Sequence, residues 1–136
     1  MTFTLHPQLE NDAITIGDLT LCRVLLMNNA NFPWLVLVPR REGLRELFDL
    51  SPTDYRTTMD EVRDVAEKFA QHTGAHKMNI AALGNMVPQL HIHIIARFTH
   101  DDAWPNPVWN SGAASTPYTS QNGAEKIAEI RSILSL

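Results

Sequence analysis

Side chains capable of chemistry recur at alternate positions of residues 89–97, Gln-Leu-His-Ile-His-Ile-Ile-Ala-Arg. A strand sends alternate side chains to opposite faces, so this spacing predicts a strand with Gln89, His91, His93 and Arg97 on one face. The apolar residues that would anchor the other face are Leu90, Ile92 and Ile94. Two imidazoles, an amide and a guanidinium are therefore expected to converge on one surface.

Three interpretations of the His-x-His pair are open. The first is structural, with both histidines as hydrogen-bonded surface or edge groups. The second is a metal site, because two imidazoles on one strand face can bind zinc. No Cys pair or Glu-rich cluster supplies obvious further ligands, so folding would have to bring in other histidines. These are His6, His72, His76 and His100.

The third interpretation is nucleophilic catalysis at phosphorus. It requires a neutral imidazole nitrogen aimed at the phosphorus atom, and the ordinary histidine pKa of about 6.5 leaves the ring largely neutral at cell pH. A covalent histidine intermediate divides one difficult phosphoryl displacement into two easier steps. Neighbouring groups would then supply donors to the phosphate oxygens and a proton for the leaving group.

The segments before this stretch predict the strands that position it. Two β-rich stretches, Ala13–Ile16 and Leu19–Met27, flank Gly17-Asp18, a dipeptide typical of a tight hairpin turn. A third strand, Trp34–Val38, ends before Pro39, which lacks a backbone donor. This order of strands predicts antiparallel pairing.

Helix and turn signals organise the second half of the chain. Ser51-Pro52-Thr53-Asp54 predicts a helix start, with a hydroxyl cap and proline at the first helical position, and the helix should end near Gly74. Met78–Leu83 and Leu90–Phe98 predict two further strands. Residues 99–122 are rich in Asp, Pro, Trp, Ser and Gly, which predicts an ordered but irregular loop.

Length and charge limit the classes of function. The 136 residues are expected to form one domain, 1–136, that ends in a short helix at about residues 123–134. The formal net charge of −4 argues against a surface attracted as a whole to nucleic acid or anionic lipid. The single Cys22 has no disulfide partner, and no apolar run approaches the roughly 20 residues that span a bilayer. Without a leader-like N-terminus, a cytoplasmic protein is expected.

The stretch around the two histidines, Val87-Pro-Gln-Leu-His91-Ile-His93-Ile-Ile-Ala-Arg97, resembles the signature strand of the histidine triad (HIT) superfamily, in which three histidines alternate with apolar residues. Gly84-Asn85-Met86-Val87 resembles the Gly-Gln-Ser/Thr-Val that precedes that strand, and the order of elements matches over about residues 12–110. The resemblance implies an α+β fold: an antiparallel sheet of about five strands, one long helix, a short C-terminal helix and a nucleotide site on the sheet surface.

The resemblance also implies roles for the matching residues. His91 matches the middle histidine, the nucleophile that becomes transiently nucleotidylated in hydrolase and transferase members. His93 matches the third histidine, which contacts phosphate and assists the leaving group. Asn85 matches a polar residue that touches phosphate, and Asn28 stands near the position of a polar residue beside the nucleotide.

Two positions depart from the family pattern. Gln89 stands where the first histidine is expected, and Trp34 stands where many members have a histidine. Glutamine can both donate and accept hydrogen bonds, so it can support the nucleophile, but it does not change charge near neutral pH. Two outcomes stay open: catalysis with Gln89 as the supporting member of the catalytic group, or a site that binds nucleotide without turnover.

Three more side chains are candidates for binding nucleotide or phosphate. Trp104 and Trp109 belong to a loop of a kind that lies near the active site in some HIT proteins. They either pack the loop or form a wall of the nucleotide or leaving-group pocket. Arg97 either contacts phosphate or faces water or an acidic partner.

The resemblance implies a nucleotide hydrolase or nucleotidyl transferase that cleaves a dinucleoside polyphosphate, such as diadenosine tetraphosphate, or a nucleoside phosphoramidate. It implies no required metal or cofactor, although Mg2+ can accompany a polyphosphate. The expected partners are the nucleotide substrate and a second copy of the chain in a homodimer, with no nucleic acid and no membrane. The alternatives are a non-catalytic nucleotide-binding regulatory protein and a metal-dependent phosphohydrolase that uses His91 and His93 as ligands.

Overall fold

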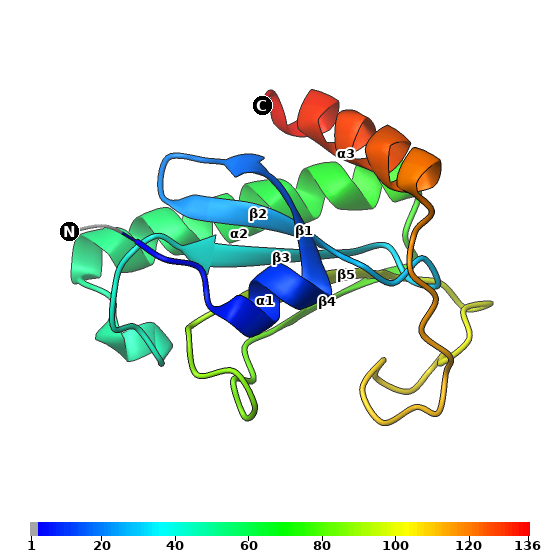
Figure 1. Cartoon of the computed structure of the whole chain (residues 1–136), viewed down its shortest axis with the longest axis horizontal. Helices are drawn as coiled ribbons and strands as arrows, with labels where there is room; N and C mark the ends of the chain where they lie inside the picture. The colour runs from blue at the N-terminus through cyan, green and yellow to red at the C-terminus, as the bar shows by residue number, and fades with distance from the viewer. Residues whose placement is uncertain (1–2) are drawn as a thin grey trace.

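A five-stranded antiparallel sheet, with helices on both faces, organises the computed structural model, which describes residues 3–136 (Figure 1). The strands lie in the order β1-β2-β3-β5-β4. The elements along the chain are α1 (Pro7–Asp12), β1 (Ala13–Asp18), β2 (Cys22–Met27), β3 (Trp34–Pro39), the 3-10 turn η1 (Leu47–Asp49), α2 (Pro52–Thr73), β4 (Lys77–Ala81), β5 (Ile92–Arg97) and α3 (Ser120–Leu134). The predicted α+β fold class is confirmed.

The long helix α2 has the ends that its sequence predicts. The Ser51 hydroxyl oxygen accepts a hydrogen bond from the Asp54 N–H at 3.1 Å, and Pro52 occupies the first helical position. Gly74 ends the helix in the left-handed region, with φ of +70°. The C-terminal helix α3 begins at Ser120, three residues before the predicted start, because the Thr119 hydroxyl caps it by accepting from the Asn122 N–H at 3.1 Å.

The first hairpin turns later than the sequence predicts. Gly17 and Asp18 belong to β1, and the turn is closed by a hydrogen bond from the Leu19 N–H to the Cys22 carbonyl oxygen at 2.9 Å. Gly17 follows a shift in the β1–β2 register, and a Cβ there would lie 3.0 Å from a guanidinium nitrogen of Arg131. The glycine therefore serves a close approach of α3 to the strand, and the predicted Gly17-Asp18 turn is wrong.

Helix α1 was not predicted from the sequence. It has six residues, too few to establish a helical period of apolar positions. Its start is nevertheless well defined, because the His6 Nδ1 accepts from the Gln8 N–H at 3.0 Å and Pro7 stands at the first helical position. Leu9 is its buried residue, so the helix is fastened to the sheet by a single apolar anchor.

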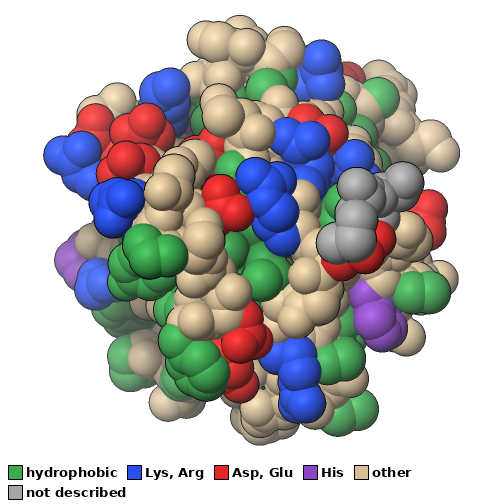
Figure 2. Space-filling view, turned by 90° about the vertical axis from the view of Figure 1, so that its left-hand side faces the viewer, with side chains coloured by type: hydrophobic (Ala, Val, Ile, Leu, Met, Phe, Trp, Pro, Cys, Tyr) green, Lys and Arg blue, Asp and Glu red, His purple; other side chains and the backbone are tan. Residues whose placement is uncertain are grey.

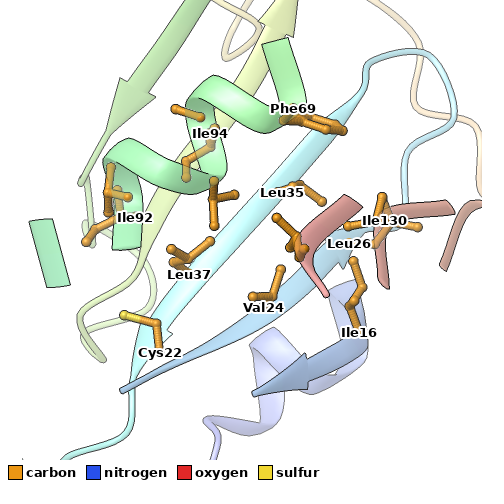
Figure 3. Packing of buried hydrophobic residues seen from close by; sticks show 14 of the residues in the cluster. Ile16, Cys22, Val24, Leu26, Leu35, Leu37, Phe69, Ile92, Ile94 and Ile130 are labelled. Atoms are coloured by element: carbon orange, nitrogen blue, oxygen red, sulfur yellow. The ribbon is translucent and has the colours of Figure 1, made fainter. Parts of the chain in front are cut away.

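A large hydrophobic core separates the sheet from α2 and α3 (Figure 3). It includes the buried residues Ile16, Cys22, Val24, Leu26, Leu35, Leu37, Phe69, Ile92, Ile94 and Ile130. Burial raises the pKa of the Cys22 thiol, so this cysteine is a neutral core residue at physiological pH. No helix in the part of the chain from residue 3 onward is both long and apolar enough to cross a membrane.

A second, smaller core covers the opposite face of the sheet. It is formed by side chains from α1 and the residues before it, from β1, β2, β3 and β5, from the β2–β3 turn, and from the segment between β5 and α3. Its buried members are Leu5, Leu9, Ala13, Leu25, Phe32, Trp34, Val36, Val38, Ile95 and Ala103. Residues 98–119 contain no regular helix or strand, whereas residues 120–122 of the predicted irregular loop 99–122 belong to α3. Because side chains alternate along β5, the face that carries Ile95 is also the face of His93.

Candidate active site

Strand β5 and the residue before it bring His91 and His93 together on the face covered by the second core. The strand begins at Ile92, later than the predicted Leu90, so His91 is the last residue of the preceding loop. His93 lies on the middle one of three adjacent strands, opposite Val36 of β3 on one side and Ala81 of β4 on the other. Each histidine is 6% exposed, and their ring centroids are 5.0 Å apart. Burial of two adjacent imidazoles requires specific hydrogen-bond partners.

The backbone around His91 assigns the proton on its ring. Nδ1 of His91 lies 2.6 Å from the carbonyl oxygen of Gln89, and a carbonyl oxygen can only accept. In the neutral ring, Nδ1 therefore carries the proton and donates to Gln89, while Nε2 keeps a free lone pair. This is the tautomer that a nucleophilic Nε2 requires.

The neighbouring His93 has the opposite tautomer. The indole Nε1 of Trp34 lies 3.0 Å from Nδ1 of His93, and an indole can only donate. Nδ1 of His93 is thus the acceptor, and the proton of the neutral ring is on Nε2. Trp34 also packs edge-on against the His93 ring with centroids 5.6 Å apart. The site therefore presents one free lone pair, on His91, beside one N–H donor, on His93.

The surroundings of His93 keep it neutral. Burial, with a smaller contribution from the adjacent His91, lowers the pKa of His93 to about 4. The ring thus carries no charge at physiological pH, and its hydrogen bond to Trp34 does not depend on pH in that range.

This depressed pKa predicts that the protein loses stability in mild acid. Above pH 6.5 His93 is neutral in both states and contributes no pH dependence. Between pH 6.5 and about 4 the unfolded chain binds a proton that the native ring does not, so the free energy of unfolding falls as the pH falls. From pH 7 to 4.5 the loss attributable to His93 is about 2 kcal/mol.

Urea unfolding at pH 7 and 4.5 measures this loss in the wild type and in His93→Gln. The variant has no imidazole to protonate at this position, so its stability should fall less than that of the wild type over the same interval. Equal losses in the two proteins would contradict the assignment. His100→Gln is the matched control, because His100 is exposed and lies outside the site.

A cavity of about 350 Å³ opens beside the two histidines. Its walls come from α1, the end of β2, the loop 83–87 and the segment after β5. The lining residues are Leu9, Asp12, Met27, Leu83, Gly84, Asn85, Met86, Val87, His91, His93, Trp109 and Asn110. The predicted residues Asn85, His91, His93 and Trp109 thus share one cavity. Gly84 has a φ of +72°, so the turn that presents Asn85 uses a backbone conformation that favours glycine.

Two tryptophans flank His93. Trp109 lies with its ring centroid 5.0 Å from that of His93, and Trp34 and Trp109 are 5.6 Å apart, edge to face. In the sequence Trp34 begins a predicted strand and departs from the family pattern, but its contact with His93 was not predicted. Its alternation with Val36 and Val38 on β3 is the signal that places it on the same sheet face as the histidines.

The side chain of Gln89 holds the N-terminal segment and does not contact His91 or His93. Its Oε1 accepts from the His6 N–H at 2.8 Å, and its Nε2 donates to the Thr4 carbonyl oxygen at 2.9 Å. Its backbone carbonyl is the acceptor for His91 Nδ1. One residue thereby connects the segment that leads into α1 with the tautomer of His91. The Gln89 amide carries its acceptor oxygen and its donor nitrogen on the same carbon, and an imidazole does not offer this geometry. A histidine at position 89 would therefore not reproduce the pair of contacts.

Replacing Gln89 with alanine should loosen the N-terminal segment while leaving the backbone acceptor of His91 in place. Loss of both side-chain hydrogen bonds is expected to cost about 1–2 kcal/mol of local stability. Hydrogen exchange of the His6 amide should speed up about tenfold in Gln89→Ala. Gln121→Ala, on the exposed face of α3, should leave that amide unchanged. An unchanged His6 exchange rate in Gln89→Ala would refute the tether.

Three of the predicted nucleotide-binding residues lie elsewhere. Arg97 is 1% exposed, and its guanidinium donates to Asp101, Asn79 and the Asn106 carbonyl oxygen. Trp104 packs over that guanidinium, with the arginine carbon 5.6 Å from the ring centroid. We therefore assign both residues to holding the loop after β5, because neither lines the cavity beside the histidines.

Asn28 likewise has a structural contact. Its Oδ1 accepts from the Tyr118 N–H at 2.9 Å, and the neighbouring Asn29 accepts from the Thr116 N–H at 3.3 Å. The two side chains fasten the end of the loop after β5 to the β2–β3 turn. Asn28 does not line the cavity beside the histidines but borders an adjoining hollow, which shares Asp12 and Met27 with that cavity and also touches Trp34.

The other histidines do not join the pair. His6 caps α1, His72 lies 3.3 Å from Glu129, and His76 packs on Trp104 with centroids 5.3 Å apart. Among residues 3–136, no group of three or more His, Cys, Asp or Glu side chains is arranged to hold a metal ion.

Comparison with known proteins identifies one family. A model of the HIT domain matches residues 8–100. A histidine triad protein from Bradyrhizobium japonicum is 43% identical, with a TM-score of 0.93 and coverage of 97% of this chain and 98% of that one. One from Marinobacter aquaeolei is 41% identical, with a TM-score of 0.95 and coverage of 99% and 98%. One from Sinorhizobium meliloti is 44% identical, with a TM-score of 0.92 and coverage of 96% of each chain. No curated protein sequence matches the chain at a significant level.

Proposed function

Because the chain belongs to the HIT family, we propose that it is a nucleotide hydrolase or nucleotidyl transferase whose nucleophile is His91. The observation that carries the proposal is the opposite pair of tautomers: a free Nε2 lone pair on His91 and an N–H donor on His93. A structural role alone would not require the two buried rings to differ in this way. The substrates are a dinucleoside polyphosphate, such as diadenosine tetraphosphate, or a nucleoside phosphoramidate.

In the first step, Nε2 of His91 attacks the α-phosphorus and forms an N–P bond. The bond from phosphorus to the leaving group breaks, and the leaving group departs with that electron pair. The ring gains positive charge because Nδ1 keeps its proton. The Gln89 carbonyl oxygen, 2.6 Å from Nδ1, stabilises that charge through a hydrogen bond that strengthens as it develops. In the second step, water attacks the phosphorus, and His91 is regenerated as nucleoside monophosphate leaves.

The groups around His91 are assigned to the phosphate. The Nε2–H of His93 donates to a phosphate oxygen or to the leaving atom, and the Asn85 side chain and the backbone of its turn add further donors. The apolar part of the cavity, with Leu9, Met27 and Trp109, holds the base. None of these steps requires a metal or cofactor, and Mg2+ enters only with a polyphosphate substrate.

The remaining expectations belong to the same proposal. The protein acts in the cytoplasm, as one domain over residues 1–136, and pairs with a second copy of itself. Its partners include neither nucleic acid nor membrane. Sedimentation at several concentrations tests the dimer, which predicts a mass of twice that of the chain.

The competing function is nucleotide binding without turnover, and one observation favours it: the side chain of Gln89 is committed to Thr4 and His6, away from the pair. Release of nucleoside monophosphate from diadenosine polyphosphates and adenosine phosphoramidate, in excess chelator, separates the two. Turnover that survives the chelator and disappears in His91→Ala supports the hydrolase. Nucleotide binding with no turnover supports the regulatory protein, and turnover abolished by the chelator supports the metal-dependent enzyme.

A further inference from the structure

A second cavity meets the proposed active site at His91. It has a volume of about 210 Å³ and lies on the side of His91 toward η1. His91, Leu83 and Gly84 border both cavities, so the two adjoin one another at the nucleophile. The remaining walls of the second cavity come from Arg45, Glu46, Leu47, Phe48, Ala82 and Leu90.

The segment that forms its outer wall is held in place by its backbone. The Leu90 N–H donates to the Leu44 carbonyl oxygen at 2.9 Å, which fixes the chain before η1 against the loop that carries His91. The Asp49 carboxylate accepts from the N–H groups of Arg45 and Glu46 at 3.0 and 2.9 Å. The backbone at Arg45 is thus positioned, while no hydrogen bond or ion pair within residues 3–136 engages its guanidinium.

The two side chains of this wall have complementary chemistry. Arg45 is the one lysine or arginine among the described residues that line either cavity. Phe48 is 84% exposed, which leaves a planar aromatic surface beside it. Figure 2 views the molecule from the side on which η1 lies in Figure 1, and hydrophobic side chains reach the surface there among side chains of both charges. Glu46 also borders the cavity, so a bound anion must sit at its Arg45 side.

From this arrangement we infer that the second cavity is a subsite for the leaving group, in which Arg45 binds its phosphates and Phe48 stacks on its base. The inference rests on the proposed function and deepens it. A substrate cleaved at His91 has two halves on either side of the reacting phosphorus. The larger cavity, with His93 and Asn85, takes the half that becomes bound to His91. The half that leaves then occupies the cavity that contains the cation, where charge-assisted hydrogen bonds hold its phosphates.

The test compares two substrates that share a nucleotidyl half and differ in the leaving group. Diadenosine tetraphosphate releases a nucleoside polyphosphate, whereas adenosine phosphoramidate releases only ammonia. In Arg45→Gln and in Phe48→Ala, the ratio of kcat/KM for diadenosine tetraphosphate to that for the phosphoramidate should fall about tenfold. Arg63→Gln is the control, since Arg63 is exposed on α2 and lines neither cavity. A ratio unchanged in both variants would overturn the subsite.

A binding measurement separates failure of the subsite from failure of the proposed hydrolysis. Absence of turnover in the wild type would refute the hydrolase. Calorimetry would still measure the affinity of the two cavities for diadenosine tetraphosphate and for AMP. Arg45→Gln should then weaken binding of the dinucleotide about tenfold relative to AMP. Equal weakening for both ligands, or none, would overturn the inference irrespective of catalysis.

Discussion

We expect His91→Ala to lower kcat for release of nucleoside monophosphate by about 10⁴-fold or more, the largest change at any position of this chain. The substitution removes the Nε2 lone pair that forms the N–P bond, and no other group in the cavity replaces it. Nδ1 of His93, the neighbouring unprotonated ring nitrogen, is occupied by the indole N–H of Trp34 at 3.0 Å. The KM value should change much less than kcat, because the walls that hold the nucleotide are intact.

Two measurements make this result specific. Quenching the wild type in alkaline denaturant during turnover should trap a nucleotidyl adduct on the peptide that contains residues 89–97, because the N–P bond to histidine is hydrolysed in acid but survives in alkali. The adduct should be absent from His91→Ala. His100→Ala is the matched control and should retain both the adduct and the rate, since its side chain is exposed outside the site. An adduct that persists in His91→Ala, or maps to another peptide, would contradict the assignment of the nucleophile.

The sequence predicted the parts of the site that depend on a simple period. Alternation in residues 89–97 correctly placed His91 and His93 on one face, because they belong to or directly precede a strand. The same argument puts Arg97 on that face, and there it lies with Ile95 above the second core. Alternation fixes the face of the sheet but not the contacts made there. Four residues beyond His93, Arg97 lies opposite Lys77, at the far end of β4 from Ala81, and its guanidinium pairs with Asp101.

Contacts between distant segments explain what the sequence did not predict. The Gln89 side chain contacts Thr4, which is 85 positions away in the sequence, and His6, which is 83 positions away. Neither Thr4 nor His6 belongs to a recognisable motif. The hydrogen bond from Trp34 to His93 spans 59 positions and needs β3 and β5 to be neighbours. The predicted strands did not specify that β5 inserts between β3 and β4. Contacts between side chains of β3 and β5 therefore depend on the order of strands in the sheet, which local sequence spacing does not predict.

The second large effect is expected on stability, at Arg97. Replacing it with methionine keeps most of the side-chain volume but leaves the Asp101 carboxylate, 6% exposed, without its partner. Burial alone raises the pKa of Asp101, but hydrogen bonds from the Arg97 guanidinium and from the N–H groups of the Phe98–Trp104 turn outweigh it. The net pKa is therefore well below the ordinary value, and the carboxylate is charged at neutral pH. An unpaired buried charge of this kind costs about 3–5 kcal/mol.

Urea unfolding at pH 7 measures the cost, and the exposed pair between Arg41 and Asp54 provides the comparison. The Arg41 Nε and Asp54 Oδ2 atoms are 2.9 Å apart, against 2.8 Å for the corresponding atoms of Arg97 and Asp101. The Arg41 side chain is 52% exposed, so Arg41→Met should cost about 0–1 kcal/mol. Similar losses from Arg97→Met and Arg41→Met would mean that the buried pair does not hold the loop. The difference between the two variants combines the burial of the Arg97–Asp101 pair with the loss of the Arg97 hydrogen bonds to Asn79 and the Asn106 carbonyl oxygen.

A double-mutant cycle separates the pair from its surroundings. Asp101→Asn leaves the Arg97 guanidinium with Asn79 and the Asn106 carbonyl oxygen as acceptors, so it should cost less than Arg97→Met. The double variant contains neither buried charge, and its loss should therefore be smaller than the sum of the two single losses by about 2 kcal/mol. Additive losses would show that the two charges act independently. Because the same loop carries Trp109 to within 5.0 Å of His93, loss of the pair should also reach the active site.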